Sequence, residues 1–566
     1  MSDLSLGAFL KKAVESTLMG SKPESSFSAP PSPLDTSLVF TPPSGSSSAP
    51  VPTPLQDDSL LTANNIGVLS TKYSLQDSVD TTDPVDYHKF ELTTSDAVSI
   101  FFNGLSAGYT LELLDSSGGV LQSSTNSGTT WTPTDSGTTA GSVTSVLNAG
   151  TYYARITPAT VTGNPLYALP GSYTLNLQPH NAPNTISIAA SNTVNAGIAD
   201  YICTGSNDQD VINQAIAAIA AQGGGTVLLM EGTYSISDNV QVTYNNITLS
   251  GVGWNTILKL ANNTRLEDAG LLRSAFHTDE ENRATPYFSN QHFLHMSLDG
   301  NKSGGTSYTN SYGNFGTYVD SSFEDLRVHD FPHYGFDPHE NSEAGQPTIR
   351  LTIKDSLADH NNVDGLTIDN CLDSLFFNNI LDSNGRHGIN IVTAATNNMV
   401  RNNVANNNGG NGIVIQPGGE LSRTSDSNFL INNVVQSNRL SGILVQLAQN
   451  TQVSGNTVTG NAQHGIRLRG SSLSSVSNNI FDDNGQAAVD QYFGVYVDDF
   501  ISGGSVVPST NNTVQNNSIR SATTRYRNGI KERSRLDDFN IYANNIISGT
   551  VRAPFQIQGP NSQVIA

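Results

Sequence analysis

Residues 364–415 read DGLTIDNCLDSLFFNNILDSNGRHGINIVTAATNNMVRNNVANNNGGNGIVI. Short apolar runs recur in this stretch, each preceded by glycine, and SGILV and HGIRL continue the series. The glycines stand at positions 365, 388, 412, 442 and 465, at intervals of 23, 24, 30 and 23 residues. A period in the low twenties with short apolar strands indicates one coil of a solenoid per repeat. We therefore expect a right-handed parallel β-helix.

An asparagine series keeps nearly the same step. Its members are Asn379, Asn403, Asn433, Asn456 and Asn479, and Asn517 and Asn545 continue it after longer insertions. Asparagine suits tight turns because it tolerates left-handed backbone angles and bonds to neighbouring backbone. Stacked coils would align these side chains in a ladder, so we interpret the series as structural.

The segment before the repeat predicts a capping helix. Ser206 or Asn207 would cap a helix with an apolar face, and Gly223–Gly225 would end it. The apolar face consists of Val211, Ile212, Ala215, Ile216 and Ile219. Strands over 226–230 and 233–236 follow, joined by a turn at Glu231-Gly232. The helix would cover the open end of the solenoid, which otherwise exposes its core. The β-helix is expected to span 183–566.

Residues 65–182 show a different pattern. DYHKFEL, AVSIFFNGL, YTLELLD, TYYARITP and SYTLNLQ are short, partly alternating runs separated by turn residues, which favours a small antiparallel β-sandwich. Asp86-Tyr87-His88-Lys89-Phe90, Leu113-Leu114-Asp115 before a Ser-Ser-Gly-Gly turn, and Gly150-Thr151-Tyr152-Tyr153 resemble the bacterial pre-peptidase C-terminal domain. That resemblance implies an accessory role.

Residues 1–64 predict no packed domain. Pro, Ser and Thr dominate from about 20 to 60, which is typical of a disordered linker. Lys11 and Lys12 interrupt the apolar residues of LSLGAFLKKAVESTLMGS, which argues against a classical signal peptide and leaves a short amphipathic helix or a frayed tail. Cys203 and Cys371 are far apart, so we expect each to pack as a small apolar residue.

The overall charge restricts the partners. A net charge of −22 and a pI near 4.7 argue against nucleic acid, which needs a broad basic face. A local basic groove could still hold an anionic polymer. No apolar run approaches the roughly 18 residues of a membrane span.

Residues 333–340, HYGFDPHE, combine an acid, an imidazole and a phenol, as proton transfer at carbon requires. Alternation predicts Tyr334 and Phe336 on one face, with Asp337 and His339 on the other. Such a His-Asp pair alone is usually structural. Here Asp364 and Asp369 follow one coil later and Arg386-His387 another coil on. Coils stack about 4.8 Å apart, so these residues should form one column, with Arg386 about two coils from His339.

Several segments resemble the catalytic module of mannuronan C-5-epimerases over roughly residues 190–560. They are FEDLRVHDFPHYGFDPHE, TIRLTIKDSLADHNNVDGLTID, NGRHGINIV, LDGN at 298–301 and NGIKERSRLDDFNIYANNI. The resemblance implies that Tyr334, Asp337, His339 and Arg386 are catalytic. It implies that Glu340, Asp369 and His387 contact the substrate or support the site. Asp364, from its place in the column, is a further substrate-binding candidate.

The implied reaction removes the C5 proton of a mannuronate within alginate. Arg386 would neutralise the sugar carboxylate with a bidentate contact, and Asp337 would assist as a protonated donor or by orienting Arg386 or His339. His339 would be the base and Tyr334 the acid that returns a proton from the opposite face. The reverse assignment of base and acid stays open.

A basic run predicts a flank for a polyuronate chain, or else a solvated charged surface. It comprises Arg520, Arg525, Arg527, Lys531, Arg533 and Arg535, and Lys531 and Arg533 are the candidate substrate-binding residues. Binding to such a flank should weaken as salt rises. The resemblance also implies a Ca²⁺ cofactor without assigning ligands, and secretion. The Gly-Gly-x-Gly-x-Asp repeats that many such enzymes contain are absent.

Two alternatives remain. A polyuronate lyase would use the same base and carboxylate clamp to form an enolate that expels the C4 oxygen. A non-catalytic polysaccharide-binding β-helix needs no His/Arg column and is usually trimeric, whereas the epimerase is expected to be a monomer.

Overall fold

The computed structural model describes residues 57–79, 83–103, 109–125, 142–158, 171–180, 184–194, 196–266, 269–274, 288–305, 311–341, 346–522, 526–549 and 551–565. Residues 1–56 of the segment expected to be disordered, 1–64, lie outside them, including the choice between a helix and a tail at its start. The expectation is wrong for 57–64, because Asp57 is buried and β1 begins at Asn64. No helix among the described residues reaches the length and apolarity of a membrane span.

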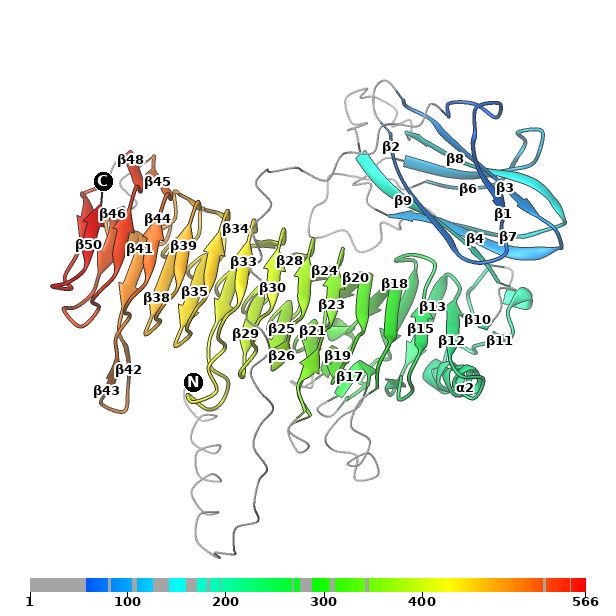
Figure 1. Cartoon of the computed structure of the whole chain (residues 1–566). Coiled ribbons are helices and arrows are strands. Elements are labelled where there is room, and N and C mark those ends of the chain that lie inside the picture. Colours follow the sequence, from blue (N-terminus) through cyan, green and yellow to red (C-terminus); the bar gives the residue numbers. More distant parts are fainter. Residues whose placement is uncertain are drawn as a thin grey trace, which may run out of the picture. The chain divides into compact units, whose positions relative to one another are not determined.

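The N-terminal part is a β-sandwich of two sheets (Figure 1). One sheet has the order β1 (Asn64–Val68), β3 (Asp86–Leu92), β8 (Gly150–Pro158), β5 (Tyr109–Leu114) and β6 (Val120–Thr125). The other has the order β2 (Tyr73–Val79), β9 (Gly171–Pro179), β4 (Asp96–Asn103) and β7 (Ser142–Leu147). Neighbouring strands are antiparallel except β1 and β3, which are parallel. Phe90 and Leu111 of the first sheet share one buried core with Ile100 and Leu175 of the second.

The remaining chain is a parallel β-helix, as expected from the period (Figure 1). A typical coil adds two short strands to a 25-stranded sheet and one to a 12-stranded sheet, and all neighbours within these two sheets are parallel. The functional residues discussed below lie mainly on the 12-stranded sheet. Its strands are β14 (Val240–Gln241), β17 (Ala269–Arg273), β19 (Ser311–Gly316), β21 (Phe336–Pro338), β25 (Leu366–Asp369), β29 (Ile389–Val392), β32 (Ile413–Ile415), β35 (Ile443–Gln446), β38 (Ile466–Arg469), β41 (Tyr492–Asp498), β46 (Tyr526–Glu532) and β49 (Ala553–Gln556).

The 25-stranded sheet forms the rest of the coil walls. Its first half comprises β10 (Thr185–Ala189), β11 (Tyr201–Ile202), β12 (Gly225–Leu229), β13 (Gly232–Ile236), β15 (Ile247–Ser250), β16 (Thr256–Leu260), β18 (Gln291–Asp299), β20 (Ser322–His329), β23 (Thr352–Lys354), β24 (Leu357–Asp359), β27 (Leu375–Phe377) and β28 (Ile380–Asp382). Its second half comprises β30 (Met399–Arg401), β31 (Val404–Asn406), β33 (Phe429–Ile431), β34 (Val434–Gln436), β36 (Gln452–Ser454), β37 (Thr457–Thr459), β39 (Ser475–Ser477), β40 (Ile480–Asp482), β44 (Thr513–Gln515), β45 (Ser518–Ser521), β47 (Ile541–Ala543), β48 (Ile546–Gly549) and β50 (Gln563–Ile565).

Helix α2 (Asp208–Ala220) caps the first coil, as predicted (Figure 1). Ile212, Ile216 and Ile219 are buried in the core of the β-helix. The expected side-chain cap is wrong, because Asn207 occupies the cap position in a left-handed conformation without a capping hydrogen bond. The Asp208 carboxylate instead accepts hydrogen bonds from backbone N–H groups of the preceding turn and of β13. Both cysteines are buried and free, as expected.

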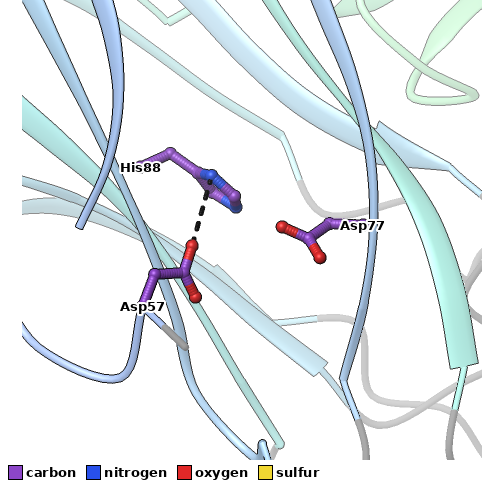
Figure 2. A group of neighbouring side chains, drawn as sticks. All are labelled: Asp57, Asp77 and His88. Atoms are coloured by element: carbon purple, nitrogen blue, oxygen red, sulfur yellow. Dashed lines mark ion pairs between the residues drawn. The ribbon is translucent and has the colours of Figure 1, made fainter. Parts of the chain in front are cut away.

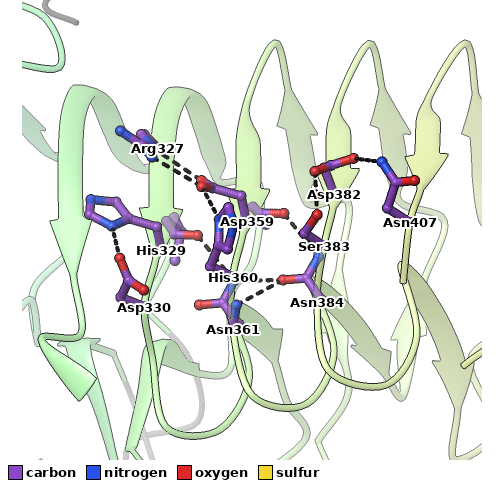
Figure 3. A network of polar contacts seen from close by, with 12 residues as sticks. Arg327, His329, Asp330, Asp359, His360, Asn361, Asp382, Ser383, Asn384 and Asn407 are labelled. Carbon is purple, nitrogen blue, oxygen red and sulfur yellow. Dashed lines mark hydrogen bonds and ion pairs between the residues drawn. The ribbon is translucent and has the colours of Figure 1, made fainter. Parts of the chain in front are cut away.

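The predicted asparagine ladder is confirmed. Each amide from Asn379 to Asn517 donates to the oxygen of the next member, over 2.9–3.1 Å, and Asn545 ends the series. Of the two proposed reasons, bonding to backbone is confirmed, because the Asn379 and Asn403 amides also donate to the carbonyls of Ile353 and Phe376. The left-handed conformation was assigned to the wrong residue, because it belongs to the one before each ladder position, such as Asn378 or Asn402. A second ladder starts with Asn361 and Asn384, whose side chains meet in Figure 3. It continues through Asn408, Asn438, Asn461 and Asn484.

The repeated glycines are required by the close stacking of the coils. A Cβ on Gly388 would lie 2.7 Å from the carbonyl oxygen of Gly412 and 2.8 Å from the amide nitrogen of Asn408. Both distances are shorter than a carbon contact allows, so any larger residue would push the next coil away.

Replacing Asn433 with alanine is expected to destabilise the β-helix strongly. Asn433 donates to Asn456 and to the Val400 carbonyl, and its oxygen accepts two hydrogen bonds from Asn403. Leaving several buried groups unpaired should cost about 3–4 kcal/mol. Denaturant unfolding of the full chain measures this loss. Gln452→Ala, at an exposed position on β36, is the control and should change stability by less than about 0.5 kcal/mol. Equal unfolding midpoints for the two variants would show that the ladder contributes little.

Candidate active site

The short strand β21 brings the HYGFDPHE motif onto the 12-stranded sheet. Its neighbours are β19 and β25, so residues from three consecutive coils meet there. Phe336 points into the apolar core, whereas Tyr334, Asp337 and His339 all line one pocket. The predicted pairing of Tyr334 with Phe336 on one face is therefore wrong. The strand begins only at Phe336, so its alternation does not reach back to Tyr334.

The pocket has a volume of about 560 Å³, within the size range of small-ligand sites. Asp337, His339, Asp369 and Arg386 line it together with Tyr334. Arg386 lies three residues before β29, which is two strands from β21, so the expected separation of two coils holds. The pocket also has walls that the sequence did not predict, formed by Tyr312, Phe315, Thr367, Asn390, Val392, Thr393, Gln416, Pro417, Gly418 and Gly419.

Stacked aromatic rings form one side of the pocket. Tyr312 lies 4.6 Å from Phe315 and 5.4 Å from Tyr334, measured between ring centroids. Phe315 lies 4.8 Å from the His339 imidazole. The two aromatic residues of SYGNFG in β19 are three positions apart, so strand alternation did not reveal that they share this wall. Such faces suit the apolar face of a sugar ring.

His339 forms an ion pair with Asp369, with Nδ1 3.2 Å from the carboxylate oxygen. Burial lowers the pKa of the imidazole, but the charge and hydrogen bonding of Asp369 outweigh it and raise that pKa to about 9. The imidazole is therefore mainly protonated at neutral pH in the free site.

Asp337 is a buried carboxyl whose surroundings raise its pKa. Its side chain is 2% exposed, and Oδ1 accepts no hydrogen bond from any described residue. Burial and the nearby Asp369 and Asp364 carboxylates hold its pKa well above the ordinary range, although the His339 charge opposes this. A raised pKa favours the protonated carboxyl, which can act as a hydrogen-bond donor.

Arg386 is already engaged by Asp364. Its Nε donates to one carboxylate oxygen over 2.8 Å and its NH2 to the other over 2.5 Å. NH2 also lies 3.3 Å from the Tyr334 hydroxyl, and the guanidinium carbon lies 5.5 Å from the centre of that ring. The expected bidentate contact with a substrate therefore cannot use the Nε edge. Only the edge that includes NH1 is left for a ligand.

Tyr334 is a neutral phenol in this environment. Burial raises its pKa above that of free tyrosine, and Asp337 and Asp364 add to this, although Arg386 lowers it. Because the phenol carries its proton at neutral pH, it can serve there as an acid but not as a base.

Three of the residues proposed to contact substrate lie behind the pocket instead. Asp364 is fully buried and accepts hydrogen bonds from Arg386, Asn390, Thr367 and the His387 backbone. Glu340 is buried and forms two short bonds to Arg423 and one to Asn370. His387 Nδ1 accepts the backbone N–H of Asn411, and burial lowers its pKa. These residues can position the pocket but do not line it.

The basic run does not form one surface. Arg520 lies on β45 of the 25-stranded sheet and pairs with Asp482, and Arg525 lies outside the described residues. Lys531 lies on β46, five strands beyond β29 and about 24 Å away at the usual strand spacing. Lys531 is aligned with Tyr496 of the neighbouring strand and, one strand further, with Arg467. Followed strand by strand, this alignment reaches Asn390 in the pocket. Arg527, Arg533 and Arg535 are exposed.

No described pocket residue belongs to a group that could hold a metal ion. Two such groups lie in the sandwich, one of which is shown in Figure 2, and a third lies in the β-helix, where Asp299, His329 and Asp330 meet. Lysines already balance that last group, with Lys259 2.5 Å from Asp299 and Lys302 3.4 Å from Asp330. Figure 3 shows the His329–Asp330 pair beside the Arg327–Asp359 pair.

Family descriptions match both parts of the chain. Residues 322–430 and 419–565 match the right-handed beta helix region, and residues 84–158 match the bacterial pre-peptidase C-terminal domain. The match over the sandwich includes all three motifs that suggested it.

Individual relatives are more specific. Mannuronan C5-epimerase AlgE5 of Azotobacter vinelandii is 32% identical over 379 residues, which are 63% of this chain and 36% of the relative. Alginate lyase 7 of the same organism is 31% identical over 372 residues, with 63% and 42% covered. The chain thus spans well under half the length of these relatives.

A solved structure matches this chain over nearly its own full length. The A-module of Azotobacter vinelandii mannuronan C-5 epimerase AlgE6 superimposes with a TM-score of 0.58 at 30% identity, covering 64% of this chain and 95% of the module. The β-helix therefore has the fold of these modules, and a pre-peptidase C-terminal domain precedes it in the sequence. This chain belongs to the mannuronan C-5-epimerase family.

Proposed function

We propose that the chain converts β-D-mannuronate into α-L-guluronate residues within alginate by removing and replacing the C5 proton. The single observation that supports this best is the convergence of His339, Tyr334, Asp337 and Arg386 in one pocket. The family membership supports the same reaction.

The carboxylate of the sugar has to be neutralised before C5 can lose a proton. Otherwise the enolate would place a second negative charge beside the first. Protonated Asp337 is suited to donate a hydrogen bond to that carboxylate, because its Oδ1 has no partner among the described residues. Arg386 would add the donors that Asp364 leaves available. Preorganised donors of this kind typically contribute 10²–10³-fold each.

Two residues would move the protons. His339 Nε2 would accept the proton as the C5–H bond breaks, and the electron pair would pass into the enolate. Tyr334 would then donate its hydroxyl proton to the opposite face of C5, with NH2 of Arg386 steadying the phenolate that forms. Exchange with solvent would return His339 and Tyr334 to their starting states.

The pH dependence of kcat/KM should report the ionisation of His339. A base must be neutral, and with a pKa of about 9 only about 1% of the imidazole is neutral at pH 7. We therefore expect kcat/KM to rise from pH 6 to about pH 9. Asp369→Asn removes the adjacent charge, lowers the pKa of His339 and should move this rising limb toward acid by about 1–3 pH units.

Asp373→Asn is the matched control for that measurement. Asp373 is exposed and lies after β26 (Cys371–Leu372), outside the pocket lining, so its loss should leave the limb in place. A limb that stays put in Asp369→Asn would argue against His339 as the base.

The substrate chain would extend from the pocket along the 12-stranded sheet. Arg467 of β38 pairs with buried Asp498 and lies 5.5 Å from the Tyr496 ring, which repeats the Arg386–Asp364–Tyr334 arrangement. Lys531 follows two strands later, over the Phe493 ring. One uronate per coil along this path would meet alternating cations and aromatic faces.

Lys531→Ala combined with Arg533→Ala is expected to weaken binding of long polymannuronate and to flatten its dependence on salt. Two counter-charges are lost, and exposed charges are screened within about 8 Å at physiological salt. Affinity measured by calorimetry at several salt concentrations tests this. Arg520→Ala is the control, because Asp482 already neutralises that guanidinium on another sheet. Wild-type affinity that does not change with salt would rule out the path.

A lyase is the second candidate, favoured by the similarity to alginate lyase 7. The same enolate would expel the C4 oxygen instead of being reprotonated. Incubation with polymannuronate separates the two outcomes. Epimerisation should give guluronate signals in the proton NMR spectrum without new ultraviolet absorbance, whereas absorbance from unsaturated uronate ends would indicate the lyase.

The proposal includes action outside the cell, because a polymer of this size is met there.

A further inference from the structure

Arg469 ends strand β38 on the outer surface of the 12-stranded sheet. Ile466 and Leu468 of that strand point into the apolar core, so alternation turns Arg469 outward. Its register partner on the neighbouring strand is Gln446, and continuing the register leads to Gln416 in the pocket wall. Arg469 therefore lies two strands beyond the pocket wall, about 10 Å at the usual strand spacing.

The guanidinium of Arg469 forms no ion pair with any carboxylate of the described residues. Among those residues it hydrogen-bonds only to Gln446, with NH1 3.1 Å from Oε1, and its Nε is buried without an acceptor. Six other arginines of the β-helix each form an ion pair with a carboxylate, namely Arg327, Arg350, Arg386, Arg423, Arg467 and Arg520. A partly buried cation with an unsatisfied donor indicates a place for an anion.

Other cations surround this guanidinium. Burial and the guanidinium groups of Arg467 and Arg533 lower the pKa of Arg469. The Asp498 carboxylate opposes this, but Arg467 already binds both of its oxygens. Arg533 follows directly after β46 and is exposed. An anion at this place would therefore relieve repulsion between like charges.

An aromatic ring supports the guanidinium from one side. The ring centre of Phe500 lies 5.1 Å from the guanidinium carbon of Arg469. Phe500 begins a hairpin that projects beyond β41, made of β42 (Phe500–Ser502) and antiparallel β43 (Ser505–Val507) (Figure 1). Its base packs on Gly470, where an added Cβ would lie 2.8 Å from Cβ of Phe500. The hairpin exposes three apolar side chains, Ile501, Val506 and Val507. A fixed cation beside an apolar wall suits a sugar ring with a carboxylate on one edge.

We propose that Arg469 binds the carboxylate of a uronate residue of the substrate chain, at a site outside the pocket. This rests on the proposed function, because the ligand is a further sugar of the same polyuronate. Gln446 holds NH1, which leaves the edge formed by Nε and NH2 for two parallel hydrogen bonds to a carboxylate. Arg533 adds positive charge beside it, and the hairpin supplies the apolar contact.

The site would select long substrate chains. Arg386 lies just before β29, and β38 is three strands further along the sheet. At one sugar per coil, the bound carboxylate belongs to a sugar about three residues from the one that reacts. A chain that is too short to span this distance cannot reach Arg469 while one of its sugars occupies the pocket. Arg469 therefore adds affinity for long polyuronate without touching the reacting sugar.

Calorimetry with an octamer of mannuronate tests the site in the full chain, with His339→Ala as the parent so that the ligand is not converted. Adding Arg469→Met removes the charge and keeps an unbranched side chain beside Phe500, and it should weaken binding about tenfold. Arg469→Lys should lie between the two, because it keeps the charge and loses the paired donors. Arg401→Met is the control, because Arg401 also lies over a phenylalanine ring but on the 25-stranded sheet. A β-1,4-linked octamer of mannose, which has no carboxylates, should bind equally to the parent and to the Arg469→Met variant.

Thermal unfolding without ligand separates binding from a structural role. Arg469→Met should unfold at or above the wild-type temperature, because the change removes repulsion between like charges. Arg467→Met should unfold below it, because Asp498 is then buried without its partner.

The outcomes distinguish this site from the proposed function. If the parent binds the mannuronate octamer and Arg469→Met binds it equally well, the Arg469 site is wrong and the proposed function stands. An Arg469→Met variant that unfolds well below the wild type would also overturn the site, because the guanidinium would then support the hairpin. If the parent does not bind the octamer and the wild type does not convert polymannuronate, the proposed function fails and the site fails with it.

Discussion

Replacing His339 with alanine is expected to lower kcat on polymannuronate by about 10²–10⁴-fold, the usual contribution of a positioned acid or base. The imidazole is the pocket group paired with Asp369, and its loss leaves no other imidazole in the described pocket lining. The fold should survive, because the His339 side chain is 24% exposed and outside the apolar core. NMR of the product measures the loss of activity, and the circular dichroism spectrum shows whether the fold is retained.

His360→Ala is the matched control for this variant. His360 pairs with Asp359 next to β24 of the 25-stranded sheet and is not part of the pocket lining (Figure 3). It should keep wild-type activity. If His339→Ala kept full activity, or if both variants lost it equally, the proposed base would be wrong.

Replacing Arg386 with alanine is expected to lower kcat/KM by about 10³-fold or more. The change removes a donor to the substrate carboxylate and to the Tyr334 hydroxyl, and it leaves Asp364 buried with its charge unpaired. An unpaired buried carboxylate would also lower stability by about 3–5 kcal/mol. Arg386→Lys should rescue little, because an ammonium cannot bind both oxygens of Asp364 as a guanidinium does.

Asp364→Asn in the Arg386→Ala background separates these two effects. It should recover most of the lost stability without recovering activity. Arg401→Ala is the control for loss of a guanidinium, because Arg401 lies on β30 over the Phe377 ring and away from the pocket lining. Wild-type turnover in Arg386→Ala would contradict the role given to the guanidinium.

The solenoid could be predicted from the sequence because its repeat is short and local. Glycine before each strand and asparagine at each turn recur at nearly fixed steps, and the coil stacking enforces both. The second ladder was missed although Asn361, Asn384 and Asn408 keep the same step. In an asparagine-rich sequence, spacing alone does not separate the buried amide from its exposed neighbour.

The pocket was only partly predictable. Coil spacing correctly put Arg386 two coils from His339. It also predicted that all candidate residues form one column, whereas some line the pocket and others lie behind it. Tyr334 was assigned to the wrong face, because the point where β21 begins is set by packing between coils. Tyr312 and Phe315 come from an earlier coil, and their closeness to His339 follows only from the stacking of β19 on β21.

The pKa values and ion pairs of the pocket residues were the least predictable from the sequence. Asp337 and Asp369 are both aspartates near one histidine, yet burial raises the pKa of the first, whereas the second raises the pKa of the imidazole. Glu340 resembles a substrate ligand in the motif, whereas it binds Arg423 and thereby holds the segment that supplies Pro417–Gly419 to the pocket wall. Burial decides each of these roles.

Incubation of polymannuronate with the wild-type chain in heavy water is the most direct test of a proton removed by one residue and returned by another. NMR of the product should show guluronate with deuterium at C5, because the hydrogen delivered by Tyr334 exchanges with solvent. Guluronate that retained protium at C5, or a polymer left unchanged, would contradict that path.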